Sequence, residues 1–256
     1  MIMAHIPKKT RGWLLAALVA LSPTVSAGEV AVAVAANFTD TTKSLAELFR
    51  KETGHTLSAS FGSTGKLYAQ IKNGAPFDVF MAADVRRPEL VESEGDGVAA
   101  TRFTYARGKL VLWNPRPNAF DKGADYLQQQ PFARLAMANP KTAPYGLAAQ
   151  QVIEHVGLLG ELQPKLVRGD SIAQTFQFVA SGNAQAGFVA LSQVKAWPEG
   201  KGTLWSIPQD FYQPIDQQAI LLKRGQNNEA AAAWLDFLKS PAAIRIIRDY
   251  GYDTAD

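Results

Sequence analysis

The chain has 256 residues, no cysteine, and 26 lysines and arginines against 23 aspartates and glutamates. Without cysteine, neither disulfide bonds nor thiolate metal sites can form, so stability must come from a packed core. The formal net charge of +3 and the isoelectric point near 9.0 would be typical of a protein with an anionic partner such as nucleic acid or a membrane.

The net positive charge lies entirely in residues 1–27. This segment contains no acidic residue, and its cations are Lys8, Lys9 and Arg11. An apolar run at 13–21 and small residues before Gly28 are typical of a signal peptide that is cleaved before Gly28. The run is about half as long as a membrane span needs, which disfavours an uncleaved anchor. We therefore expect an exported protein with balanced charge and no nucleic-acid partner.

Short apolar runs alternate with amphipathic stretches in the rest of the chain, which predicts an α/β fold. Strands are expected at 29–36, 55–61 and 78–82, with helices between them at 39–51 and 64–72. This strand and helix order is typical of half of a doubly wound sheet.

A second set of elements is expected after Gly108. The predicted strands are 109–113, 134–138, 186–190 and 218–222. The predicted helices are 145–156, 171–180, 228–239 and 242–250. Residues 114–131 are expected to form a polar connection.

Four strand-to-helix junctions carry small or hydroxyl-bearing residues, at 36–39, 62–65, 144–146 and 169–172. Ligands of doubly wound sheets bind at the carboxyl ends of the strands, where helix N-termini present unpaired N–H groups. Several such ends that converge can bind an anion without lysine or arginine. The side chains that could add neutral donors are those of Asn37, Ser63, Thr64 and Tyr145. At any single junction, ordinary N-capping is the alternative.

The segment around Ser63 partly matches two known motifs, one of serine hydrolases and one of nucleotide-binding loops. Ser63 and Lys66 fit the Ser-x-x-Lys pattern of serine acyltransferases and β-lactamases. The partner motifs are echoed only at 181–183 and 141–143, in the wrong order, and the segment 141–143 lacks the glycine of its motif. A Walker A loop would require Ser or Thr where Leu67 stands. A serine hydrolase therefore remains only a remote alternative, and we expect no enzyme.

Metal and acid–base sites are poorly supported. His55 and His155 lack a second ligand three or four residues away, so both are expected to be structural or surface groups. Asp78 and Asp84 flank a predicted strand and are expected to act in caps or turns rather than as a carboxylate pair. The Tyr-Gly-Tyr ending at 250–252 is interpreted as a glycine helix cap with packed rings rather than a phenolate iron site.

At these junctions the chain resembles the periplasmic molybdate-binding proteins of ABC importers, a branch of the type 2 solute-binding fold. The most specific match is the pattern G-A-P-x-D-[VL]-F-x-[AS]-A-D at 74–84. The other matching segments are 34–38, 61–71, 139–146, 186–189 and 248–252. The matches run in order along essentially the whole exported chain.

The resemblance implies two doubly wound α/β lobes joined by crossing strands, with the ligand in the cleft between them. Lobe 1 would comprise residues 28–107 and 215–256, and lobe 2 residues 108–214. The ligand would be molybdate or tungstate, no cofactor would be required, and the partner would be the membrane permease of an ABC importer. The protein is expected to act as a monomer.

Carried over position by position, the resemblance places ligand donors at all four junctions. In lobe 1 they fall on Asn37 and on the hydroxyl of Thr64, with Ser63 adjacent as a further candidate. In lobe 2 the backbone donors fall on Tyr145 and Ile172.

One position departs from the pattern of the family. Some members place a tyrosine hydroxyl on the ligand directly after the strand at 186–189, and Ala190 stands there in this chain. Members with Asn at the first junction and Tyr at the third resemble this chain and manage without that donor. Ala190 leaves another tetrahedral oxyanion, such as sulfate, as an alternative ligand.

Overall fold

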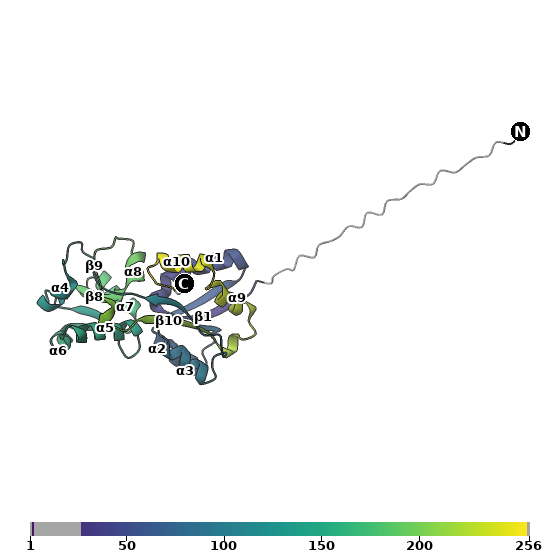
Figure 1. Cartoon of the computed structure of the whole chain (residues 1–256), viewed down its shortest axis with the longest axis horizontal. Coiled ribbons are helices and arrows are strands. Elements are labelled where there is room, and N and C mark those ends of the chain that lie inside the picture. Colours follow the sequence, from purple (N-terminus) through teal and green to yellow (C-terminus); the bar gives the residue numbers. More distant parts are fainter. Residues whose placement is uncertain (1, 3–26, 255–256) are drawn as a thin grey trace.

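The computed structural model describes residue 2 and residues 27–254, which form two lobes side by side (Figure 1). The predicted signal peptide, residues 1–27, lies outside the described residues except for Ile2 and Ala27. Each lobe is built on one mixed five-stranded sheet covered by helices, which confirms the predicted α/β class. Within the described ranges, no helix combines the length and the apolar character that a membrane crossing requires.

The sheet of the first lobe has the strand order β2, β1, β3, β10, β4. Its strands are β1 (Glu29–Ala35), β2 (Thr56–Gly62), β3 (Val79–Ala82), β4 (Phe103–Gly108) and β10 (Ile215–Leu221). β1 is parallel to β2 and β3, whereas β10 runs antiparallel to both of its neighbours. The carboxyl ends of β1, β2 and β3 therefore meet at one edge of the sheet.

Alternate residues of β1 face two different helical layers, as the period of two in a strand requires. The helices of this lobe are α1 (Thr39–Thr53), α2 (Thr64–Lys72), α3 (Arg86–Ser93), α9 (Glu229–Phe237) and α10 (Pro241–Asp249), with the short turns η1 (Ala36–Phe38) and η4 (Lys223–Gly225). Val30, Val32 and Val34 pack in the core under α1, α9 and α10, whereas Ala33 faces α2 and α3.

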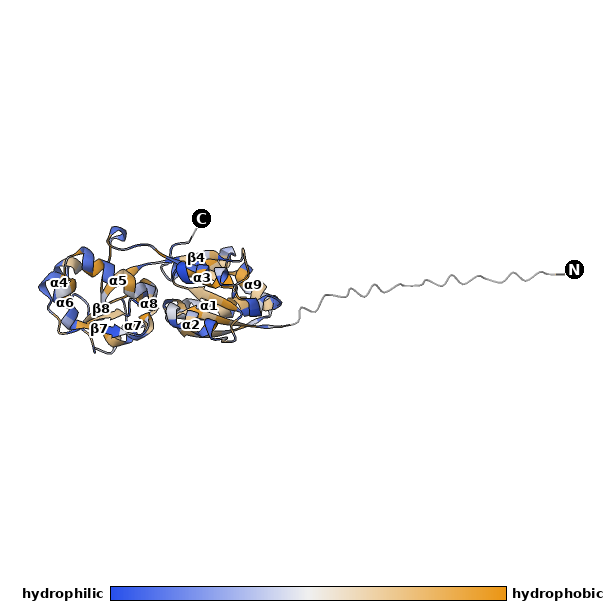
Figure 2. Ribbon diagram, turned by 90° about the horizontal axis from the view of Figure 1, so that it is seen from below, coloured by the Kyte–Doolittle hydropathy of each residue, from blue (hydrophilic) through white to orange (hydrophobic). Residues whose placement is uncertain are grey.

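The sheet of the second lobe has the order β7, β6, β8, β5, β9. Its strands are β5 (Leu110–Asn114), β6 (Leu135–Ala138), β7 (Leu166–Gly169), β8 (Ala186–Ala190) and β9 (Thr203–Ser206). Its helices are α4 (Gly123–Gln129), α5 (Pro144–His155), α6 (Leu159–Leu162), α7 (Ile172–Ala180) and α8 (Leu191–Ala196), with the turns η2 (Gln163–Lys165) and η3 (Gln209–Phe211). Hydrophobic segments lie in the interior of both lobes, and hydrophilic segments lie mainly on outer helices and loops (Figure 2).

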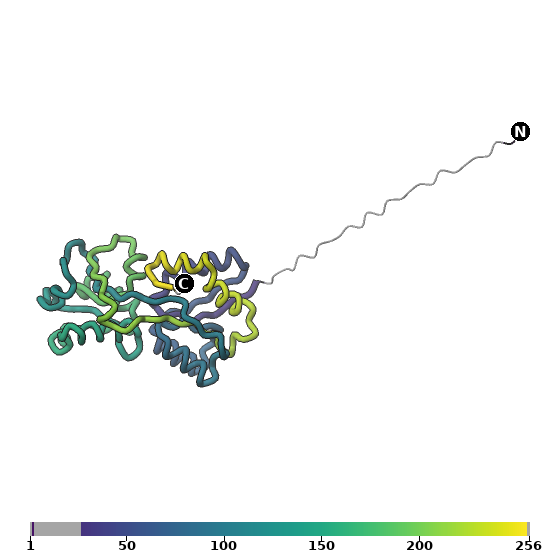
Figure 3. The backbone as a smooth tube through the Cα atoms, in the orientation of Figure 1, coloured from purple at the N-terminus to yellow at the C-terminus, as the bar shows by residue number. Residues whose placement is uncertain are grey.

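The chain crosses between the lobes twice. It leaves the first sheet at Gly108, enters the second at Leu110, and returns between β9 and β10. The two crossing segments run side by side (Figure 3), and Gly108 is paired with Ile215. Near this point, the N–H of Leu110 donates to the hydroxyl of Tyr212 at 3.2 Å. Crossing strands joining two lobes were predicted, and the structure confirms them.

Several short elements escaped the prediction. They are α3, β4, α4, α6, β7, α8 and β9. Most are too short to display a full period of alternating or helical hydrophobicity. The polar connection predicted at 114–131 was wrong in part, because α4 lies there. β10 begins at residue 215 rather than 218, because the polar run of Asp216 and Gln217 hid its start.

Candidate functional site

A small cavity lies between the two lobes, where several element starts converge. The cavity has a volume of about 10 Å³. Its walls come from the ends of β1 and β2, the residue after β3, and the starts of η1, α2, α5 and α7. All five residues that the sequence predicted as ligand donors line it, namely Asn37, Ser63, Thr64, Tyr145 and Ile172. The structure therefore brings together, at one point, segments that are far apart in the sequence.

The helix starts supply backbone donors to the cavity. Thr64, Tyr145 and Ile172 lie in the first turns of α2, α5 and α7, where N–H groups have no acceptor within their own helix. Pro144 occupies the first position of α5, so Tyr145 provides the first N–H of that helix. These N-termini carry partial positive charge, which favours an anion.

Two hydroxyls at the start of α2 add side-chain donors. Thr64 Oγ1 accepts a hydrogen bond from the N–H of Ala83 at 3.0 Å, which leaves its own proton free to donate. Ser63 Oγ is buried, and among the described residues it has no hydrogen-bond partner. Since buried polar groups are normally paired, Ser63 is the hydroxyl whose environment most clearly calls for a ligand.

Asn37 lines the cavity, but its side chain is also part of a buried polar network. Its Nδ2 donates to Gln217 Oε1 at 2.9 Å and to the hydroxyl of Tyr252 at 3.0 Å. Ser192 Oγ and the Tyr252 hydroxyl both lie within bonding distance of the backbone carbonyl of Asn37, at 3.0 and 2.8 Å. Asn37 Oδ1 is buried and has no partner among the described residues.

The hydroxyls around this network remain protonated at neutral pH. Burial raises the pKa of Tyr145 and of Tyr105 well above the usual value, and burial likewise raises the pKa of Tyr252. The side chain of Tyr145 is committed to Gln217, whose Nε2 donates to its hydroxyl at 3.3 Å. The donor that Tyr145 offers to the cavity is therefore its backbone N–H rather than its phenol.

No residue that lines the cavity carries a formal charge. An anion bound there would be held by N–H and O–H groups alone, each of them strengthened by the charge of the ligand. Among the described residues, no cluster of three or more histidines, aspartates and glutamates could hold a metal ion. The neutral donors of the cavity wall are of the kind that bind an oxyanion.

Direct bonds between the lobes close the cavity from outside. The N–H of Gly65 donates to the carbonyl of Thr142 at 2.9 Å, and Arg87 Nη2 donates to the carbonyl of Lys141 at 3.1 Å. Lys66 Nζ, on lobe 1, lies 2.7 Å from Asp170 Oδ2, on lobe 2. These contacts hold the lobes in a closed arrangement.

The Ser-x-x-Lys hydrolase pattern lacks its chemical basis in the structure. That mechanism requires the lysine to contact the serine hydroxyl. Lys66 instead pairs with Asp170, and both side chains are at least half exposed. Ser63 Oγ has no partner among the described residues, and thus no base to activate it.

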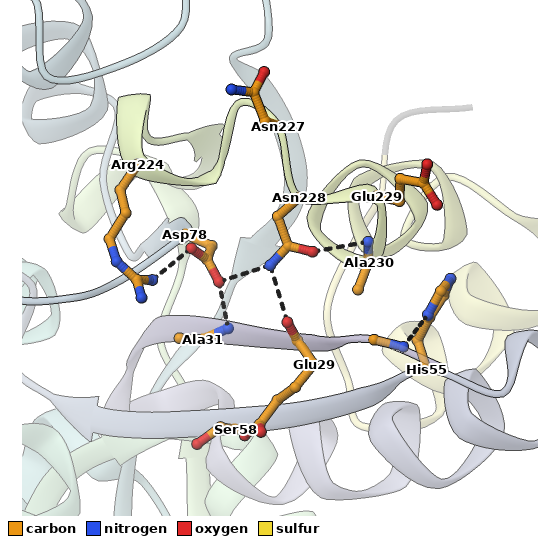
Figure 4. A pocket seen from close by; sticks show the side chains of 11 residues that line it. Glu29, Ala31, His55, Ser58, Asp78, Arg224, Asn227, Asn228, Glu229 and Ala230 are labelled. Atoms are coloured by element: carbon orange, nitrogen blue, oxygen red, sulfur yellow. Dashed lines mark hydrogen bonds and ion pairs between the residues drawn. The ribbon is translucent and has the colours of Figure 1, made fainter. Parts of the chain in front are cut away.

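A larger and more open pocket lies at the opposite end of β1 (Figure 4). Its buried carboxylate, Asp78, is already paired: Oδ1 accepts from Arg224 at 2.6 Å, and Oδ2 accepts from the N–H of Ala31 at 2.9 Å. Asn228 Nδ2 donates to Asp78 Oδ2 at 3.0 Å and to the carbonyl of Glu29 at 2.9 Å. This network ties the start of β1 to the start of β3 and to the N-cap of α9.

The remaining candidate residues take structural roles. His55 Nδ1 accepts from the N–H of Gly28 at 3.0 Å, and His155 stacks on Phe211 with ring centroids 4.0 Å apart. Asp84 pairs with Arg87 at the other end of β3 from Asp78, so the two carboxylates form no pair. Gly251 has a φ of 88° and caps α10 by donating to Arg248 at 2.8 Å, as expected for a glycine C-cap.

Sequence reasoning missed the polar residues behind the cavity, above all Gln217. In the sequence, Gln217 directly precedes the strand predicted at 218–222. In the structure it is fully buried and lies within β10. Ala190 does not line the cavity. Its N–H donates to Gln193 Oε1 at 3.1 Å, and Gln193 Nε2 donates to the carbonyl of Ile172 at 3.1 Å. The junction at Ala190 thereby anchors the first turn of α7.

Comparison with known proteins places the chain in a family. A model described as bacterial extracellular solute-binding protein matches residues 30–253. Molybdate-binding protein ModA of Azotobacter vinelandii is 53% identical over 235 residues, covering 91% of this chain and 92% of that protein. Molybdate-binding protein ModA of Rhodobacter capsulatus is 50% identical over 255 residues, covering 98% and 100%.

A solved structure, the Azotobacter vinelandii periplasmic molybdate-binding protein, is similar with a TM-score of 0.85 and 41% identity. The match covers 89% of this chain and 100% of that chain. Its two-lobed architecture agrees with the fold described above. The chain belongs to the bacterial extracellular solute-binding protein family.

Proposed function

We propose that this protein is the periplasmic binding component of an ABC importer, which captures molybdate and delivers it to a membrane permease. The observation that carries the proposal is the uncharged cavity between the lobes, where helix starts converge and the hydroxyl of Ser63 has no partner among the described residues. The two relatives at 53% and 50% identity, both named for molybdate binding, support the choice of ion. Members of this family bind solutes, and the protein is not an enzyme.

The proposed ligand set combines three side chains with backbone donors from both lobes. In lobe 1 it comprises Asn37 and the hydroxyls of Ser63 and Thr64. In lobe 2 it comprises the N–H groups of Tyr145 and Ile172. Neutral donors suit a transport protein, because they hold a dianion through oriented dipoles without a fixed countercharge that would slow release.

Selectivity against sulfate would come from the size of the ion. Sulfate has the same charge and the same tetrahedral shape as molybdate, but it is smaller. Each donor that the smaller ion leaves unsatisfied costs roughly 1–3 kcal/mol. Tungstate is nearly equal to molybdate in size, so the two should bind with similar affinity. The cavity requires no cofactor.

We infer that the two lobes close on the ligand as rigid bodies. The proposed limits are residues 28–107 and 215–256 for lobe 1, and 108–214 for lobe 2. The composition of the two sheets and the two crossings support these limits. Ligand contacts from both lobes would favour the closed state through motion at the crossings. The protein is proposed to act as a monomer without a nucleic-acid partner, after cleavage of an export signal at residues 1–27.

Calorimetric titration of the exported chain with molybdate, tungstate, sulfate and phosphate tests the proposal. We expect tight and similar binding of molybdate and tungstate, and much weaker binding of the other two ions. Equal affinity for sulfate and molybdate would refute it. A preference for sulfate would instead favour the second candidate, a binding protein for another oxyanion, which Ala190 keeps open.

A further inference from the structure

A network of buried polar side chains lies directly behind the cavity. Its members come from lobe 1, from lobe 2 and from the crossing strand β10, and all are buried. They are Asn37, Tyr105, Tyr145, Ser192, Gln217 and Tyr252. Because the network includes Asn37 and Tyr145, which line the cavity, its arrangement determines what the cavity presents to a ligand.

Gln217 is the centre of this network. Its Oε1 lies 2.9 Å from Asn37 Nδ2 and 3.1 Å from the Tyr105 hydroxyl, and its Nε2 lies 3.3 Å from the Tyr145 hydroxyl. A β-bulge brings these groups together. Gln217 is opposite Ala106 and Gln218 is opposite Thr104, so Tyr105 has no opposite residue on β10. Bulges of this kind redirect side chains beside functional sites.

The orientation of Asn37 conflicts with its proposed role as an anion donor. Its Nδ2 is committed to Gln217 and Tyr252, so the atom left without a partner is Oδ1. An amide oxygen is an acceptor and would repel an oxyanion. The orientation that binds an anion is the reverse one, with Nδ2 as the free end of the amide.

The network permits this reversal if both amides turn over together. The oxygen and nitrogen ends of an amide are nearly equal in shape, so no heavy atom outside the two amides needs to move, and only hydroxyl protons turn. The Tyr252 hydroxyl would turn its proton from the backbone carbonyl of Asn37 to Asn37 Oδ1, and Ser192 Oγ would still donate to that carbonyl. Gln217 Nε2 would then donate to Asn37 Oδ1 and to the Tyr105 hydroxyl, and the Tyr145 hydroxyl would donate to Gln217 Oε1. Tyr105 retains an acceptor in the carbonyl of Ala82, which lies 3.2 Å from its hydroxyl. Each heavy-atom contact of Gln217 thus remains a hydrogen bond.

We propose that Gln217 is a positioning residue for anion binding: in the anion-bound protein it donates to Asn37 Oδ1 and thereby presents Asn37 Nδ2 to the ion. This inference rests on the proposed function of the cavity. Gln217 also bonds to Tyr145, so it connects the side-chain donor of lobe 1 to the residue that supplies a backbone donor from lobe 2.

Substitution of Gln217 tests this role against a matched control. The change Gln217→Leu removes the group that orients Asn37. We expect affinity for molybdate to fall roughly tenfold to a hundredfold, the effect of losing one hydrogen bond to a charged group. The change Gln218→Leu alters the same residue type at the next position of β10. Its partners are Arg102 and Thr104, away from the cavity, so we expect near-unchanged affinity.

Neutron diffraction from the perdeuterated wild-type protein with molybdate distinguishes positioning from general structural support. Deuterium locates the NH₂ end of each amide directly, and the measurement does not depend on whether a variant folds. We expect the deuterons of Asn37 on the end that faces the ion, and those of Gln217 on the end that faces Asn37. Deuterons of Asn37 directed at Gln217 in the complex would overturn the inference.

The two experiments also separate this inference from the proposed function. If the wild-type protein fails to bind molybdate in calorimetry, the proposed function fails. If the wild-type protein binds molybdate and Gln217→Leu binds it equally well, the cavity binds the ion but Gln217 does not position Asn37.

Discussion

The cavity between the lobes and the larger pocket at the far end of β1 differ in how their polar groups are paired. The larger pocket contains Asp78, Arg224 and Asn228, and these side chains bond to one another and to nearby backbone (Figure 4). The cavity contains no charged residue, yet Ser63 Oγ and Asn37 Oδ1 have no partner among the described residues.

This difference shows why neither volume nor charge identifies the site. A paired carboxylate and guanidinium have little left to offer a ligand, and here they stabilise the junction of β1, β3 and α9. Unpaired polar groups in a buried space are costly unless a ligand or a rearrangement satisfies them. Ligand binding should therefore depend on the cavity between the lobes, and stability on the larger pocket at the far end of β1.

The largest effect is expected from removing both hydroxyls at the start of α2. The double change Ser63→Ala and Thr64→Ala should lower molybdate affinity by about a hundredfold or more, since each charge-assisted bond contributes roughly 1.5–3 kcal/mol. Calorimetry measures the affinity. The control is the double change Thr56→Ala and Ser58→Ala. These two residues are exposed and lie in the first half of β2, the strand that precedes α2. Equal affinity in both double variants would place the site elsewhere.

The change Asp78→Ala should act on stability instead of binding. It leaves the N–H of Ala31 without its acceptor and removes one of the two acceptors of Asn228 Nδ2, which should lower the free energy of unfolding by about 2–3 kcal/mol. Urea denaturation measures this loss. The folded variant should bind molybdate normally, and Asp236→Ala, which breaks an exposed pair with Lys239, should cost little. Weakened binding in Asp78→Ala would show that the pocket and the cavity are coupled.

The change Gly65→Ala should hinder closure of the cavity. A Cβ at Gly65 would lie 3.1 Å from the backbone of Thr142 and from Arg87 Nη2, where the lobes meet. We expect about tenfold weaker molybdate binding, which is the effect of losing about one hydrogen bond between the lobes. Small-angle scattering should show a larger radius of gyration for the variant than for the wild-type protein in the presence of the ion. Gly160→Ala, where a Cβ meets nothing within 4 Å, is the control.

Affinity for molybdate should be nearly independent of pH between roughly pH 7 and 9. The cavity wall has no charged side chain, and burial raises the pKa of Tyr145, Tyr105 and Tyr252, which keeps their hydroxyls protonated. Above about pH 10 the unfolded chain loses phenolic protons that the folded protein retains, so stability should fall there. Calorimetry and thermal unfolding across this range measure both effects. A titration of affinity near neutrality would indicate an ionisable ligand group.

The smallest effect is expected for Lys66→Ala. Its pair with Asp170 links the lobes, but both side chains are at least half exposed, and such pairs contribute about 1 kcal/mol or less. Molybdate affinity should change by about fivefold at most. A loss comparable to that of the hydroxyl variants would mean that the lysine acts directly on the ligand.

Much of the fold was predictable because its longest elements carry strong patterns. The alternation in β1 and the amphipathic character of α1 and α10 predicted them within a few residues. Short elements such as β7 and β9 were missed, since four residues hold too few alternations to signal a strand. The start of β10 was misplaced because a buried Gln217 resembles a loop residue until its partners are known.

The sequence by itself determined the chemistry that this protein can offer: no thiolates, balanced charge after residue 27, and neutral donors at four strand-to-helix junctions. The resemblance to molybdate-binding proteins was likewise visible in the motifs, and the relatives confirm it. Only the tertiary structure decided that the four junctions meet in one cavity, that Ser63 is left unpaired, and that Gln217 holds Asn37. The physical reason is that local sequence pattern places the junctions along the chain, whereas their convergence and hydrogen-bond pairing depend on contacts between residues as much as 215 positions apart.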